Sequence, residues 1–179
     1  MFEIFQMIAA LLAIAIAALL IYAAFKPNHG TMARSLSIAA PPERIFPMID
    51  NLRNMNTWNP FVKTDPNLKG VYGGPEQGRG ATFEFDGNKN AGAGHITITD
   101  SVPSSKVTMS LVMNRPFACS NVVEFTLRAT GANSTDVTWA MSGPAPYMAR
   151  VMGTVFNMEK MVGGTFDKGL ADLKRAVEH

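Results

Sequence analysis

The sequence predicts an α+β protein in which one long C-terminal helix covers a curved antiparallel sheet of about seven strands. Three observations lead to this prediction. Runs of alternating apolar and polar residues, separated by short turns, fill most of the chain from Leu68 to Ser142. Apolar residues then recur every three or four positions from Pro146 to Val177. A stretch without any charged residue, Met7–Phe25, precedes all of these elements.

The uncharged stretch predicts a single transmembrane helix. At 1.5 Å per residue, a helix over Met7–Phe25 spans roughly 28 Å, close to the hydrocarbon core of about 30 Å. Glu3 is the only charged side chain before Lys26. We therefore expect residues 1–27 to form an N-terminal membrane anchor and residues 28–179 to form one globular domain.

Two other interpretations of the same stretch are weaker. A cleaved signal peptide is disfavoured because no Lys or Arg precedes the apolar run, which is also long for such a peptide. A buried soluble helix is disfavoured because the run is apolar on every face. The positive charges of Lys26, Arg34 and Arg44 follow the stretch, so the positive-inside rule slightly favours a cytoplasmic position for the globular domain.

The globular part begins with a short linker at residues 28–31 and an alternating strand at residues 34–38. Two prolines then end the strand and start a helix, and a second short helix or loop surrounds Trp58. Turn residues separate the strands that follow, which indicates an antiparallel meander. These strands are expected at residues 68–72, 80–86, 92–102, 106–113, 117–129 and 135–142, and one helix at residues 146–177.

The composition excludes several classes of function. A net charge of +2, with Lys and Arg scattered along the chain, does not favour nucleic-acid binding. Cys119 is the only cysteine and the three histidines lie far apart, so we expect neither a disulfide nor a metal site. No phosphate-binding loop or dinucleotide fingerprint occurs, and we expect no cofactor.

Strand alternation identifies the side chains that face inward, because successive residues point to opposite faces of a sheet. A helix that bridges a curved sheet leaves a gap, and the inward apolar residues would line it as a cavity for a small molecule. Met152 and Val155 would face this gap from the helix. The predicted cavity residues are Trp58, Tyr72, Phe83, Phe85, Ile96, Met109, Leu111, Asn121, Val123, Trp139, Met141, Met152 and Val155.

Asn121 is the one polar side chain in the inward register of these strands. A buried amide without hydrogen-bond partners costs about 1–3 kcal/mol. The amide is therefore either satisfied by the core or a buried water, or it anchors the polar end of a ligand. The sequence leaves both possibilities open.

Four segments resemble the START-like superfamily, also called SRPBCC or the polyketide cyclase/dehydrase and lipid-transport family. They are Ser35–Phe46 (SLSIAAPPERIF), Trp58–Pro60 (WNP), Thr138–Pro144 (TWAMSGP) and Met161–Leu173 (MVGGTFDKGLADL). The resemblance covers about residues 31–178. It implies the helix-grip fold and an internal cavity for lipids, sterols, polyketides or hormones.

A minority of that family catalyses cyclisation or dehydration, with His, Arg, Tyr or acidic groups in the cavity. The lining predicted here offers only Asn121, with Tyr72 as a further polar group, so we expect no catalytic residue. The expected function is membrane-anchored binding of a hydrophobic or amphipathic molecule, lipid-like or polyketide-like. A cyclase or hydratase, and a protein-interaction module with a collapsed cavity, are the alternatives.

Overall fold

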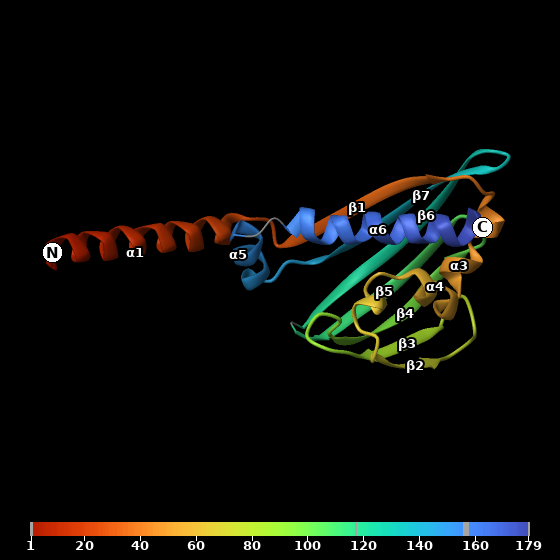
Figure 1. The fold of residues 1–179 in the computed structure, drawn as a ribbon, viewed down its shortest axis with the longest axis horizontal. Coiled ribbons are helices and arrows are strands. Elements are labelled where there is room, and N and C mark those ends of the chain that lie inside the picture. Colours follow the sequence, from red (N-terminus) through yellow and green to blue (C-terminus); the bar gives the residue numbers. More distant parts are fainter. Residues whose placement is uncertain (1, 117, 156–157, 179) are drawn as a thin grey trace.

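The structure is a computed structural model that describes residues 2–116, 118–155 and 158–178. A helix projects from a domain built on a seven-stranded antiparallel sheet (Figure 1). The helices are α1 (Phe2–Phe25), α2 (Pro42–Ile45), α3 (Pro47–Asp50), α4 (Leu52–Trp58), α5 (Tyr147–Val155) and α6 (Met158–Glu178), with a 3-10 turn at Val62–Thr64. The strands are β1 (His29–Ile38), β2 (Lys69–Gly73), β3 (Thr82–Asp86), β4 (Ala93–Val102), β5 (Lys106–Arg115), β6 (Cys119–Gly131) and β7 (Ser134–Pro144).

The strand order β1-β7-β6-β5-β4-β3-β2 confirms the predicted meander, since every strand from β2 to β7 pairs with the next along the chain. β1 closes the order by pairing antiparallel with β7 over its whole length, from His29 opposite Pro144 to Ile38 opposite Thr135. This pairing extends β1 to His29, so the prediction of a linker over residues 28–31 was wrong. The backbone of these residues finds its hydrogen-bond partners in β7 instead.

Three short helices follow β1, where two were predicted. Pro42 and Pro47 each stand in the first turn of a helix, where a missing amide hydrogen costs nothing. The Asn51 side chain caps α4 by accepting hydrogen bonds from the backbone N–H groups of Arg53 and Asn54. The buried apolar residues of these helices, which include Ile45, Ile49, Leu52, Met55 and Trp58, form one side of the core.

The predicted C-terminal helix is two helices. α6 packs against β1 and β7, and α5 instead packs against α1 (Figure 1). Phe166, Leu170, Leu173 and Val177 of α6 are buried in the core, whereas α5 has no buried residue. Residues 156–157, which join α5 to α6, lie outside the described residues, and the apolar spacing of the sequence slips near Met158. A helix whose apolar stripe changes phase cannot keep one face on the sheet.

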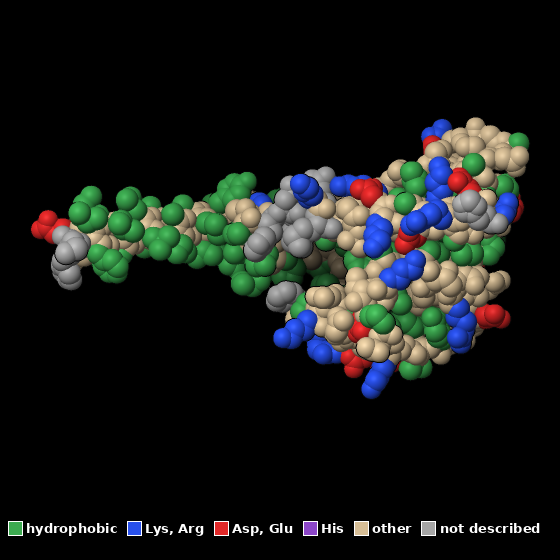
Figure 2. All heavy atoms as spheres, viewed as in Figure 1, with side chains coloured by type: hydrophobic (Ala, Val, Ile, Leu, Met, Phe, Trp, Pro, Cys, Tyr) green, Lys and Arg blue, Asp and Glu red, His purple; other side chains and the backbone are tan. Residues whose placement is uncertain are grey.

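Helix α1 stands outside the domain. Apolar side chains cover it, and the Lys, Arg, Asp and Glu side chains gather on the globular part (Figure 2). The span Glu3–Phe25 is long and apolar enough to cross a membrane, by length and composition, and most of its large side chains are exposed. The small side chain of Ala23, near the end of this span, is fully buried.

Candidate functional site

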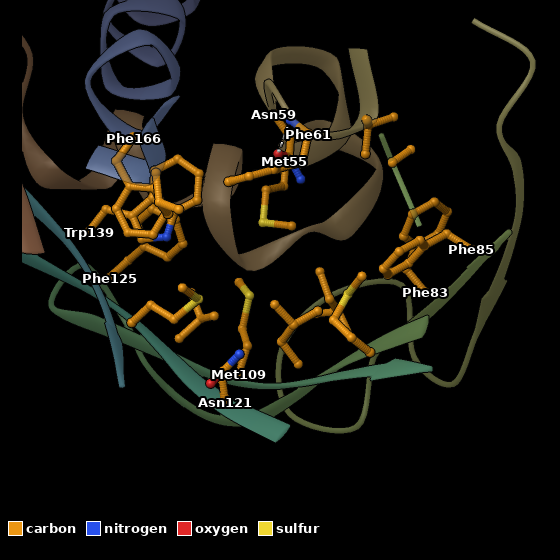
Figure 3. Close-up of a pocket in the computed structure, with 18 of the residues that line it drawn as sticks. Met55, Asn59, Phe61, Phe83, Phe85, Met109, Asn121, Phe125, Trp139 and Phe166 are labelled. Atoms are coloured by element: carbon orange, nitrogen blue, oxygen red, sulfur yellow. Dashed lines mark hydrogen bonds between the residues drawn. The ribbon is translucent and has the colours of Figure 1, made fainter. Parts of the chain in front are cut away.

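A cavity of about 290 Å³ lies between the concave face of the sheet, α4 and the first half of α6 (Figure 3). Small-molecule sites commonly measure about 300–1,000 Å³, so this cavity is just below the lower end of that range. Its wall is formed by Met55, Trp58, Asn59, Phe61, Val62, Phe83, Phe85, Asn90, Ala91, Ile96, Met109, Leu111, Met113, Pro116, Asn121, Val123, Phe125, Trp139, Met141, Val162 and Phe166.

The sheet register builds the floor of the cavity in rows. Met109 on β5 lies opposite Val123 on β6, which in turn lies opposite Met141 on β7. Directly opposed residues point to the same face of a sheet, so a row of apolar side chains crosses these three strands. Leu111 opposite Asn121 continues the floor one step along the strands.

Aromatic rings close one end of the cavity. Trp139 on β7 stacks on Phe166 of α6 with ring centroids 4.2 Å apart and planes 6° apart. Trp58 meets Trp139 and Phe125 edge-on, with centroids 5.8 and 5.9 Å away. The Trp58 indole N–H donates to the Met48 carbonyl at 2.8 Å, which fixes the ring. These contacts hold α4, α6 and the sheet together beside a space that they do not fill.

Asn121 brings an amide into this apolar wall. In the part of the chain that the structure describes, the hydrogen bond of its side chain is a weak one, from Nδ2 to Cys119 Sγ at 3.5 Å. Gly143 makes room for the amide from β7, because a Cβ at Gly143 would lie 2.0 Å from Asn121 Oδ1. The amide therefore keeps hydrogen-bonding capacity beside the cavity.

The other two polar residues of the wall are asparagines in loops. Asn59 is buried, and its Oδ1 accepts from the Phe61 backbone N–H at 3.1 Å, so its carbonyl serves the turn that it belongs to. Asn90 lies exposed between β3 and β4, beside Ala91. The lining residues given above include no Asp, Glu, His, Lys, Arg, Tyr or Cys, so none of them titrates in the physiological range.

Most of the residues predicted for the cavity lie in its wall: Trp58, Phe83, Phe85, Ile96, Met109, Leu111, Asn121, Val123, Trp139 and Met141. Tyr72 does not. It belongs to the edge strand β2, its ring packs on Phe83 with centroids 4.6 Å apart, and its hydroxyl accepts from Asn56 Nδ2 at 3.0 Å. Phe83 thus stands between Tyr72 and the cavity.

Met152 and Val155 also lie outside the cavity wall. Both belong to α5, where their side chains are 39% and 58% exposed. Both were predicted as cavity residues because one continuous C-terminal helix was expected from the sequence. In the structure α5 instead packs beside α1, whereas α6 packs on the sheet.

Other wall residues were not predicted as site residues. The sequence pattern could have identified four of them as wall residues. Met113 and Phe125 follow the inward alternation of β5 and β6, and Val162 and Phe166 follow the helical spacing of α6. The sequence pattern could not have identified the loop and turn residues, because no period links them to a face of the sheet. These residues are Asn59, Phe61, Val62, Asn90, Ala91 and Pro116. Met55 belongs to the short helix α4.

The family model described as polyketide cyclase / dehydrase and lipid transport matches residues 29–178. The chain belongs to this family. The match begins at the first residue of β1 and ends at the last residue of α6. It confirms the resemblance found in the sequence, and the curved sheet with its C-terminal helix confirms the helix-grip fold. No curated protein matches the chain.

Solved structures with the same fold include three bacterial proteins. A protein from Chromobacterium violaceum is 15% identical, with a TM-score of 0.57 over 86% of this chain and 99% of that one. A protein from Bacillus thuringiensis is 18% identical, with a TM-score of 0.57 over 84% and 100%. The protein XoxI from Bacillus cereus is 19% identical, with a TM-score of 0.57 over 86% and 99%. At these identities the likeness concerns the fold.

Proposed function

We propose that the protein binds one apolar or amphipathic small molecule in this cavity and does not transform it, while α1 anchors the domain to a membrane. The observation that carries the proposal is the wall itself, which is apolar except for the amides of Asn59, Asn90 and Asn121 and the indole N–H groups of its two tryptophans. Removal of apolar surface from water favours an apolar ligand, at about 25 cal/mol per Å². The Asn121 amide offers hydrogen bonds to a single polar group on such a ligand.

The absence of titratable groups from the described wall supports binding over catalysis. A cyclase or dehydratase must move protons, and positioned acids and bases commonly contribute about 10²- to 10⁴-fold to such reactions. An amide side chain neither gives up nor takes a proton near neutral pH. The open volume of about 290 Å³ likewise supports a ligand over a collapsed interaction module.

The membrane part of the proposal rests on α1. In the proposed division, residues 1–27 form a single-pass anchor and residues 28–179 form the ligand-binding domain. An apolar helix that is exposed over nearly its whole length is costly in water and stable in a bilayer. Lys26, Arg34 and Arg44 on the domain side favour a cytoplasmic position for that domain.

Native mass spectrometry of the full chain, released from detergent micelles, tests the binding function. The wild type should carry a bound small molecule. Val123→Phe should reduce its occupancy at least tenfold, because Val123 is 7% exposed and lines the cavity. Val122→Phe is the matched control: this neighbour on β6 is 48% exposed and is not part of the wall. Equal occupancy in the two variants would refute the cavity as the site.

A further inference from the structure

Helix α5 is fastened to the C-terminal end of α1 by reciprocal hydrogen bonds. Arg150 Nη1 on α5 donates to the carbonyls of Ala24 and Lys26, at 3.0 and 2.9 Å. Lys26 Nζ, just beyond α1, donates to the Gly153 carbonyl of α5 at 3.0 Å. A cation in α5 or directly after α1 thus meets carbonyls near the C-terminal end of the other helix, where a positive charge is favourable.

A further hydrogen bond fixes the position along α1 at which α5 packs. The Tyr147 hydroxyl at the start of α5 donates to the Leu20 carbonyl at 2.9 Å. Helix α5 therefore lies beside the last turns of the apolar helix. Because α1 spans the hydrocarbon core in the proposed function, its last turns stand at the boundary between hydrocarbon and headgroups.

Helix α5 presents an apolar face that the described part of the domain leaves uncovered. Met148, Met152 and Val155 share one side of the helix, at a spacing of four and three residues, and are 62%, 39% and 58% exposed. Arg150 points to α1 instead. A short helix with one apolar side and a cation directed elsewhere suits a position parallel to a membrane surface.

The side chains around this junction are those that membrane interfaces favour. Tyr22 of α1 precedes Lys26 by four residues, and the Lys26 Nζ lies 5.5 Å from the centroid of the Tyr22 ring. Tyr147 of α5 pairs in the same way with Arg150, whose Cζ is 5.6 Å from the ring. Phe25 is 85% exposed at the same end of α1. Tyrosines, with lysine and arginine nearby, are enriched at the headgroup level.

The cavity lies near the same end of the domain. Met113 and Pro116 line it from the end of β5, and Val162 lines it from the beginning of α6, shortly after α5. Figure 1 places the end of β5 and the beginning of α6 on the side from which α1 projects, and Figure 2 shows the surface hollowed there.

From these observations we propose that α5 is an interfacial helix that binds the lipid bilayer beside α1. Its apolar side, formed by Met148, Met152 and Val155, enters the boundary between headgroups and acyl chains. The cavity is then held next to the bilayer, and an apolar ligand passes between membrane and cavity without crossing water. This inference rests on the proposed anchoring by α1 and adds a second membrane contact to it.

Site-specific quenching tests the contact with the full chain in phosphatidylcholine vesicles. In a Cys119→Ser background, Met152→Cys carries an environment-sensitive NBD label. A shallow spin label on the lipid, 5-doxyl phosphatidylcholine, should quench that label at least twofold. Met148→Cys provides an independent second position on the same side of α5. Asn133→Cys is the control, since Asn133 is exposed in the turn between β6 and β7, at the far end of the domain, and should stay unquenched (Figure 1).

Flotation of the same vesicles distinguishes anchoring by α1 from membrane contact by α5. A chain that floats with the vesicles and is quenched at both α5 positions supports the proposal. A chain that floats but is quenched no more at Met148→Cys and Met152→Cys than at Asn133→Cys overturns the interfacial role of α5 and leaves the anchor intact. A chain that does not float overturns the anchor, and the role of α5 with it.

Discussion

Gly169 permits a close approach between α6 and the Trp139 side of the cavity wall. A Cβ at this position would lie 2.6 Å from Trp139 Cζ3 and 3.0 Å from Pro60 Cδ. The Trp139 ring has little freedom to retreat, because it is stacked on Phe166 and meets Trp58 edge-on. Gly169→Ala should therefore push α6 away from the sheet.

The expected change in stability on Gly169→Ala follows from two opposing effects. Overpacking of a core typically costs about 1–3 kcal/mol, whereas replacing a mid-helix glycine by alanine gains about 1 kcal/mol of helix propensity. Gly164→Ala isolates the second effect, because Gly164 is an exposed residue of the same helix with nothing within 4 Å of the added Cβ. Relative to Gly164→Ala, Gly169→Ala should be less stable by about 1–3 kcal/mol.

Urea and thermal unfolding of the full chain in detergent micelles, followed by tryptophan fluorescence, measures this difference. Trp58 and Trp139 are both buried in the core and report on it directly. For a domain of this size, 1 kcal/mol corresponds to about 2–4 °C, so the melting temperatures should differ by roughly 2–12 °C. Equal stabilisation by both substitutions would refute the close packing of α6 on Trp139.

Three further predictions concern other parts of the domain. Gly143→Ala should destabilise the fold by about 1–3 kcal/mol, because the added Cβ collides with the Asn121 amide. In a double-mutant cycle, Asn121→Ala should restore part of that loss. Strictly additive effects of the two substitutions would contradict the contact. Burial raises the pKa of Asp172, but its hydrogen bonds and attraction to Lys63 and Arg175 outweigh burial and hold the pKa below the usual 3.8. Urea unfolding measures how much more stable the wild type is than Asp172→Asn. This difference should be full above pH 3.8 and shrink as the pH falls through the lowered pKa. A difference independent of pH would contradict the lowered pKa of Asp172. Asn51→Ala removes the cap of α4 and should cost about 0.5–2 kcal/mol in the same assay, whereas an unchanged midpoint would show that the cap contributes nothing.

The sheet could be predicted from the sequence because its inner and outer faces differ in polarity. In β5, for example, Val107 and Met109 are buried, and Thr108 between them is only partly buried. A period of two residues fixes which side chains face the helix, and the turn residues fix where each strand ends. The same logic located the sheet part of the cavity wall, from Phe83 to Met141.

The remaining differences have physical reasons that a local pattern does not contain. The sequence could not reveal that α5 packs on α1, because that contact depends on hydrogen bonds between Arg150 or Lys26 and distant backbone carbonyls. The wall contributed by Asn59 and Asn90 depends on loop conformation, which has no period. Tyr72 follows the alternation, yet its place on the edge strand puts Phe83 between it and the cavity.

The connection between α1 and β1 is very short, and this limits how far the domain can lie from α1. Helix α1 ends at Phe25 and β1 begins at His29, so residues 26–28 alone join them. Fully extended, they reach roughly 11 Å, at about 3.6 Å per residue. If α1 anchors the protein as proposed, so short a connection keeps the domain beside its own membrane. A bound ligand would then be exchanged at that membrane, with the recipient coming to the protein.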